Sequence, residues 1–116
     1  MYEYQAQIDE VVDGDTIDVV VDLGFNMRRD IRLRLDGVDT AETYGVSNDS
    51  EEYARGSEHT QFVEQWIDTD TTSEWPFIVR TEKKGKFGRY LATIERKEDR
   101  NELTEALLEE FDGVEY

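Results

Sequence analysis

An alternation of apolar and polar side chains in two neighbouring stretches limits the possible folds of this chain most strongly. In residues 16–23 and 31–35 every second residue is aliphatic, and most residues between them are polar or charged. A period of two is typical of strands that are buried on one face. The segment Gly24-Phe25-Asn26-Met27 between them predicts a chain reversal. With a further strand over residues 2–12, this half of the chain predicts a three-stranded meander.

The second half of the chain predicts two helices and two more strands. Ser57 is expected to cap a helix that ends near Asp68, because Phe62, Val63, Trp66 and Ile67 recur at helical spacing. Residues 77–79 and 89–94 are expected to form a hairpin, and residues 102–111 an amphipathic helix. This element order predicts an α+β fold, a five-stranded OB-fold β-barrel with two helices, in a single domain spanning residues 1–116.

The charge of the chain is strongly negative, but its basic residues are clustered. There are 29 acidic and 13 basic residues, a net charge of −16, which as a whole repels nucleic acid. Nine basic residues fall in two short segments: Arg28, Arg29, Arg32 and Arg34, then Arg80, Lys83, Lys84, Lys86 and Arg89. We hypothesise that the acidic remainder is a salt-adapted (halophilic) surface on which molar salt screens the repulsion.

Several kinds of site and location are excluded or not expected. The chain has no cysteine, so disulfides and thiolate metal sites are excluded. Its single histidine, His59, is expected on a helix surface and cannot form an imidazole metal site alone. No stretch is apolar enough to span a membrane, and the N-terminus lacks a basic, apolar leader. A cytoplasmic protein is expected, with a secreted or virus-associated one as the alternative if a leader was removed.

Three charged motifs indicate phosphate and metal chemistry. They are Asp13-Gly14-Asp15-Thr16, the run Arg34-Leu-Asp-Gly-Val-Asp39-Thr-Ala-Glu42, and Phe87-Gly88-Arg89. Carboxylates are suitable ligands for a hard divalent cation, and the arginine fork binds two phosphate oxygens at once. Each motif alone also fits a plain turn or a surface ion pair.

Together, in this order and at these intervals, the motifs resemble those of the staphylococcal nuclease (thermonuclease) family over nearly the whole chain. The tail Thr104-Glu-Ala-Leu-Leu108 also resembles the family's Asn-Glu-Ala-Leu helix. The resemblance implies a monomeric, calcium-dependent nuclease. Its substrate would be DNA, with RNA also open, and its products would carry 3′-phosphate and 5′-hydroxyl ends.

The resemblance also implies a role for each matched residue. Asp15 and Asp39 would bind calcium through their carboxylates and Thr40 through its backbone carbonyl. Glu42 would position or deprotonate the attacking water, and Arg34 and Arg89 would hold the scissile phosphate. The residues expected to contact substrate further out are Lys83, Lys84, Phe87 and Tyr116.

The chain departs from the family pattern at Thr104, where the family has asparagine, and at two positions near the third motif. Gly85 stands where the family usually has aspartate, and Phe87 replaces the usual tyrosine, which bears on substrate affinity more than on chemistry. Two other functions stay open. One is a non-catalytic module that binds nucleic acid or protein, and the other is a structural domain that uses calcium for stability alone.

Overall fold

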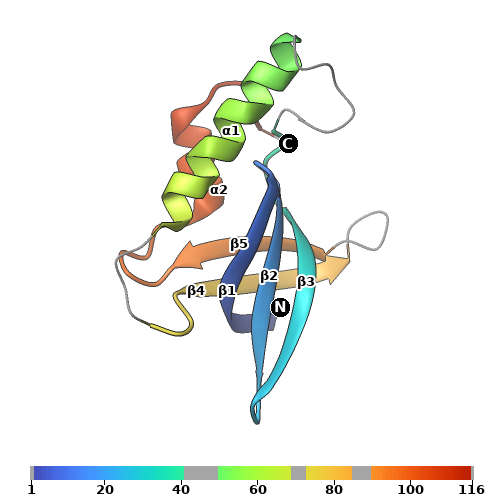
Figure 1. The fold of residues 1–116 in the computed structure, drawn as a ribbon, viewed down its shortest axis with the longest axis vertical. Coiled ribbons are helices and arrows are strands. Elements are labelled where there is room, and N and C mark those ends of the chain that lie inside the picture. The colour runs from blue at the N-terminus through green and yellow to red at the C-terminus, as the bar shows by residue number, and fades with distance from the viewer. Residues whose placement is uncertain (1, 41–49, 69–72, 85–89, 116) are drawn as a thin grey trace.

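The computed structural model describes residues 2–40, 50–68, 73–84 and 90–115, and of residues 82–84 it describes the backbone alone. The elements, in chain order, are β1 (Tyr2–Asp13), β2 (Thr16–Gly24), β3 (Met27–Leu35), α1 (Glu51–Ile67), β4 (Phe77–Lys84), β5 (Tyr90–Arg96) and α2 (Leu103–Glu110). The strands form a barrel, and both helices lie at one end of it (Figure 1). The predicted element order is confirmed.

The barrel is closed in the order β1-β2-β3-β5-β4, and β4 pairs back to β1. The β3–β5 pair is parallel, and the remaining pairs are antiparallel. The connection from β3 to β4 carries α1, and α2 follows β5. This is the OB-fold-like barrel with two helices that the sequence predicts.

The core follows from the period of two. Ile17, Val19 and Val21 point inward from β2 and are at most 1% exposed, as are Leu33 and Leu35 from β3. Burying a side chain of this size stabilises the fold by about 1.5–3 kcal/mol. The helices close one end of this core, because α1 packs on β1, α2 packs on β5, and the two helices contact each other.

The start of α1 differs from the prediction. The helix begins at Glu51, with Ser50 as its N-cap, and the Ser50 Oγ accepts a hydrogen bond from the Tyr53 N–H at 3.0 Å. Glu51 and Glu52 lie in the first turn, where negative charge favours the positive end of the helix dipole. The prediction of a cap at Ser57 was therefore wrong.

The β2–β3 turn is confirmed and has an unusual composition. Phe25 and Asn26 have positive φ values of 55° and 61°, which is the pattern of a type I′ hairpin turn. Both strands of the second hairpin extend beyond the predicted ranges, over Phe77–Lys84 and Tyr90–Arg96.

Within the described part of the chain, no helix is long and apolar enough to cross a membrane.

Candidate functional site

Asp15 lies in the turn between β1 and β2, and its carboxylate is buried but well bonded. Its Oδ2 accepts the Thr40 backbone N–H at 3.0 Å and lies 2.8 Å from the Arg34 Nη1. Its Oδ1 accepts the Thr16 hydroxyl at 3.0 Å. The Leu35 N–H also donates to the Asp15 carbonyl at 2.8 Å, which fixes the turn against β3. These bonds satisfy the carboxylate that folding removes from water.

Arg34 connects Asp15 to the loop that follows β3. The β2–β3 register pairs Thr16 with Arg34 and so brings the guanidinium beside the Asp15 turn. Its Nη1 also donates to the Val38 carbonyl at 3.2 Å, and its Nη2 lies 3.2 Å from the Asp39 Oδ1. The Arg34 side chain is 17% exposed, so one largely buried cation joins two carboxylates.

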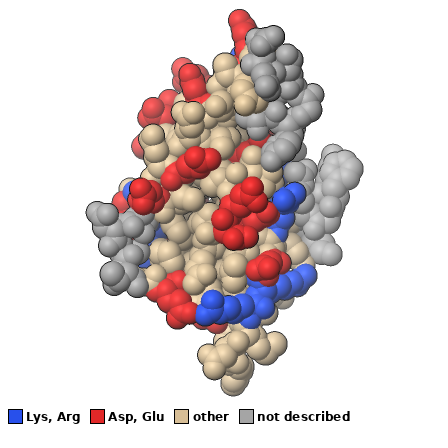
Figure 2. All heavy atoms as spheres, viewed as in Figure 1, with Lys and Arg blue, Asp and Glu red and all other residues tan. Residues whose placement is uncertain are grey.

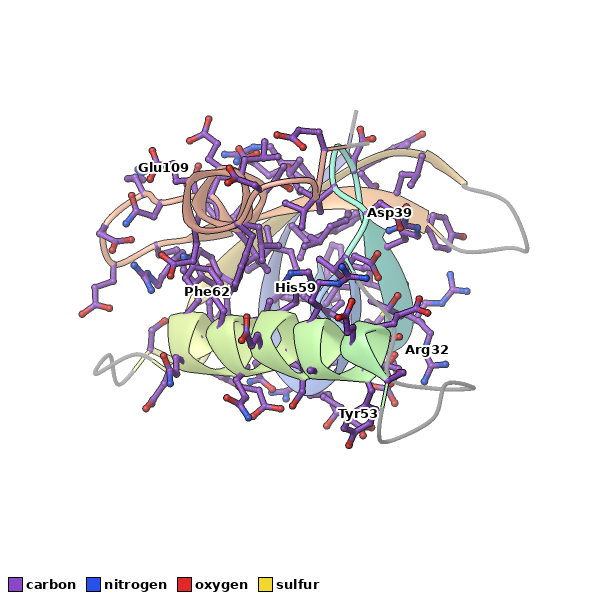
Figure 3. All side chains as sticks on the ribbon, turned by 90° about the horizontal axis from the view of Figure 1, so that it is seen from above. Arg32, Asp39, Tyr53, His59, Phe62 and Glu109 are labelled. Carbon is purple, nitrogen blue, oxygen red and sulfur yellow. The ribbon has the colours of Figure 1, made fainter. Side chains whose placement is uncertain are left out.

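Asp39 and Thr40 are positioned by the C-terminal segment as well as by β3. The Asp39 N–H donates to the Val114 carbonyl at 2.7 Å, and Val38 forms a bridge with Glu115. The Asp39 side chain is 60% exposed and lies at the edge of the site (Figure 3). Thr40 is buried, and its hydroxyl has no hydrogen-bond partner within the described residues. The loop therefore presents one open carboxylate and one buried oxygen.

His59 is buried against this site, so the prediction that it lies on the surface was wrong. It points from α1 into the space between the helices and the barrel (Figure 3) and is 6% exposed. Its ring packs edge-on against Phe111 with centroids 4.4 Å apart. Burial lowers the pKa of His59 below its ordinary value of 6.5, although the negative charges of Glu58 and Asp15 oppose this shift.

The sequence contains a signal for the burial of His59. Val63 and Trp66 follow it at the fourth and seventh positions, which places the three residues on one helix face. Gly14 permits the close approach of this face. A Cβ added there would lie 2.9 Å from both the His59 Cβ and the Thr40 Oγ1. The motif glycine therefore lets α1 and the Thr40 loop meet at the Asp15 turn.

The remaining candidate residues lie outside the described residues or have undescribed side chains. Glu42, Phe87, Arg89 and Tyr116 belong to the first group. The backbones of Lys83 and Lys84 form the end of β4, but their side chains belong to the second group. Among the described candidates, the structure brings together Asp15, Arg34, Asp39 and Thr40.

The donor types of this cluster fit a hard cation. Asp15 and Asp39 offer carboxylate oxygens, and the buried Thr40 hydroxyl is a further oxygen without a partner in the described part of the chain. Calcium binds six to eight oxygens at roughly 2.3–2.6 Å. The described residues contain no group of three acidic or histidine side chains that could hold a metal together. They fit calcium in donor type and would need water and phosphate oxygens to complete its ligands.

No protein-family model and no curated protein matches this chain.

Proposed function

We propose that this protein is a calcium-dependent nuclease of the staphylococcal nuclease type, which hydrolyses phosphodiester bonds of DNA and, as a second substrate, RNA. The observation that carries the proposal is the position of Arg34, whose guanidinium lies between Asp15 and Asp39 next to Thr40. In a chain with a net charge of −16, a largely buried arginine at this point is a fixed site for one phosphate.

The two ends of the Arg34 guanidinium are held differently. The Asp15 carboxylate and the Val38 carbonyl hold its Nη1 and fix the plane of the guanidinium. The pair with Asp39 is longer, at 3.2 Å, and its carboxylate is mostly exposed. Phosphate oxygens would therefore displace Asp39 from the guanidinium more easily than Asp15. Because the group is largely buried, its attraction to phosphate is stronger than that of a surface arginine.

Asp15, Asp39 and the Thr40 carbonyl would hold the calcium ion. When bound, that ion would offset the net negative charge of the cluster and stabilise the charge that develops on the phosphate. Glu42 follows Asp39 by three residues, a spacing that lets it position or deprotonate the attacking water. Arg89 is the second phosphate ligand in this proposal and would add charge that Arg34 cannot supply alone.

The test is cleavage of single-stranded DNA with calcium in about 1 M potassium chloride, where surface repulsion is screened. The wild-type protein should cleave, and a chelator should stop it. Glu42→Gln should lower the rate by about 10²-fold or more, because it removes the base. Arg34→Lys should also lower it, because lysine cannot bind two oxygens in one plane. The matched control is Arg32→Lys, since Arg32 forms an exposed pair with Asp18. An inactive wild-type protein, or a Glu42→Gln variant of equal activity, would refute the proposal.

One observation favours the alternative of a non-catalytic binding module. The Arg34 guanidinium is already paired with the carboxylates of Asp15 and Asp39, as in an ion-pair network that serves only the fold. Calorimetry separates the two functions. Calcium binding that requires a nucleotide phosphate supports the nuclease. Calcium binding that stabilises the fold without nucleotide supports a structural role. Nucleotide binding whose affinity does not depend on calcium supports the non-catalytic binding module.

A further inference from the structure

Most of the large apolar side chains that are exposed in the described part of the chain lie at one end of the barrel. Among the described residues five large apolar side chains are exposed, and four of them are Tyr2 at 64%, Leu23 at 40%, Phe25 at 98% and Met27 at 58%. They lie at the β2–β3 turn and at the start of β1. In Figure 2 this turn protrudes as an uncharged tip, with Lys and Arg side chains gathered directly beside it. We call Tyr2, Leu23, Phe25, Met27 and Arg29 the hairpin surface.

The hairpin surface is uncovered because the β2–β3 hairpin projects beyond the barrel, on the side away from the helices (Figure 1). The pairing of β1 with β2 extends no further toward the turn than Ala6 with Val21. β5 pairs with β3 only from Leu33 to Leu35. Leu23, Met27 and Arg29 continue the inward-facing side of the two strands, where the barrel no longer covers it.

Phe25 is poorly explained by folding alone. It occupies the first central position of the type I′ turn with a φ of 55°, where asparagine or glycine is favoured and a bulky side chain is strained. Its side chain is 98% exposed and so adds nothing to the core. A strained and fully exposed aromatic residue at a hairpin apex indicates a contact outside the chain.

A hollow of about 250 Å³ lies beneath the hairpin, at the mouth of the barrel. The rings of Tyr2, Tyr4 and Tyr90 line it together with Leu23 and Arg29, and its other lining residues are aliphatic or threonine. None of the ten residues is acidic, although the chain has 29 acidic residues. Its volume is just below the roughly 300 Å³ of the smallest drug-sized sites, which suits a single planar ring system.

Arg29 is the cation that faces this hollow. Arg28 pairs with Glu74, and Arg32 pairs with Asp18. Within the described part of the chain, Arg29 has no ion pair of its own. An arginine without a counter-charge beside tyrosine rings suits a ligand that combines an anionic group with a flat aromatic one.

We propose that the hairpin surface binds an unpaired stretch of the nucleic-acid strand that the nuclease site cleaves, with bases stacked on Phe25 and in the hollow and a phosphate at Arg29. This inference rests on the proposed function. Stacking on aromatic side chains with arginine contacts to the backbone is how single strands are bound without sequence preference. A flat lipid surface would use the exposed tip but not the concave, tyrosine-lined hollow.

The hairpin surface and the cleavage site lie on opposite faces of β3, because an odd number of positions separates Arg29 from Arg34, and β5 covers the edge of β3 only from Leu33 to Leu35. Arg29 precedes Arg34 by five residues on β3, a distance of about 17 Å along the strand. The hollow extends to Tyr90, the first residue of β5, which pairs with Leu33 beside Arg34. A strand several nucleotides long would span both places, whereas a dinucleotide would reach only one. The proposal therefore predicts a preference for longer single-stranded substrates.

The test is the affinity of fluorescent oligonucleotides for the full chain, measured by anisotropy without calcium so that no cleavage occurs. In about 1 M potassium chloride, a thymidine decanucleotide should bind wild-type protein much more tightly than a dinucleotide does. Phe25→Gly should reduce decanucleotide affinity about ten-fold or more, the loss expected for one stacked base. The same change relieves the strained turn, so it should raise the melting temperature while it weakens binding. Arg29→Gln should weaken binding without that rise.

Leu108→Ala is the matched control, because Leu108 is 36% exposed on α2 and should leave affinity unchanged. Decanucleotide affinity that is unchanged in Phe25→Gly and Arg29→Gln overturns this inference, even if the wild-type protein cleaves DNA. Wild-type protein that binds through Phe25 but never cleaves supports single-strand binding at the hairpin surface and refutes the nuclease. Two further results overturn the inference when Phe25→Gly binds the decanucleotide as tightly as wild type does. They are Phe25-dependent sedimentation with phosphatidylglycerol vesicles, and Phe25-dependent dimerisation in ultracentrifugation.

Discussion

At the scale of single residues, the burial of an ion pair determines what its loss costs. Arg34 and Asp15 have side chains that are 17% and 10% exposed, whereas Arg32 and Asp18 are 55% and 23% exposed. Exposed pairs contribute little, because water and salt compete with them. A buried carboxylate that loses its partner keeps the full penalty of desolvation. The two arginines lie on the same strand, but their ion pairs contribute very differently to the stability of the fold.

We therefore expect Arg34→Ala to destabilise the fold by about 2–4 kcal/mol, because it leaves the Asp15 carboxylate buried without its cation. Arg32→Ala, with the same loss of one positive charge, should cost less than about 1 kcal/mol. Urea denaturation followed by circular dichroism measures both. Equal midpoints for the two variants would show that the Arg34 cluster does not support the fold. Arg34→Ala together with Asp15→Asn should recover part of the loss, because the unpaired charge is then removed.

His59 gives the stability of the protein a pH dependence. Burial lowers its pKa below 6.5, so the unfolded chain takes up a proton before the folded protein does. The contribution of neutral His59 is fully present above pH 6.5 and is lost as the pH falls from there through the lowered pKa. We expect the melting temperature to fall between about pH 7.5 and about pH 5.5, in the range where an unperturbed histidine titrates.

His59→Gln isolates this effect, because glutamine does not titrate. The difference in melting temperature between the wild-type protein and His59→Gln should narrow as the pH falls through this range. Glu102 acts in the opposite direction, since burial and the nearby Glu105 raise its pKa, but it is common to both proteins. Parallel melting curves for the two proteins would contradict the burial of His59.

At the scale of elements, the strands were predictable and the helix positions were less so. Alternation in β2 and β3 is a local signal, and barrel packing preserves it, so Ile17, Val19 and Leu33 are buried as predicted. The first turn of α1 carries no apolar stripe that marks it, and its start depends on a side-chain cap at Ser50, seven residues before the predicted cap. The burial of His59 depends on α2 and the Asp15 turn, which are distant in sequence. Local patterns therefore predicted the barrel, while the surroundings of His59 required the tertiary structure.

The two serines of this region provide a direct test of where α1 begins. Ser50→Ala should destabilise the protein by about 1 kcal/mol, because it removes the oxygen that accepts the Tyr53 N–H. Ser57→Ala should be neutral or slightly stabilising, because Ser57 lies inside the helix, where alanine is the better former. Thermal melts of the two variants decide the matter. A larger loss for Ser57→Ala would restore the start that the sequence alone suggested.

At the scale of the whole molecule, the charge distribution opposes the compact fold. The net charge is −16, and neither helix has a basic residue in its last turn. Figure 2 shows acidic side chains spread over the visible face, with basic ones gathered mainly near the β2–β3 tip. Self-repulsion of this size weakens the folded state at low salt, and screening reduces it as the Debye length falls from about 10 Å at 0.1 M to about 3 Å at 1 M.

We therefore expect the melting temperature to rise from about 0.1 M to about 1 M potassium chloride, as screening shortens the range of the repulsion. Glu109→Gln should stabilise the protein at low salt by about 0.3–1 kcal/mol, because this exposed carboxylate opposes both the net charge and the negative end of α2. Glu51→Gln removes the same charge from the first turn of α1, where the dipole favours it, so its two effects should nearly cancel. Both differences should shrink at 1 M salt. A wild-type melting temperature that stays flat or falls as the salt concentration rises would contradict the salt-adapted surface. It would show that no repulsion is present for the salt to screen.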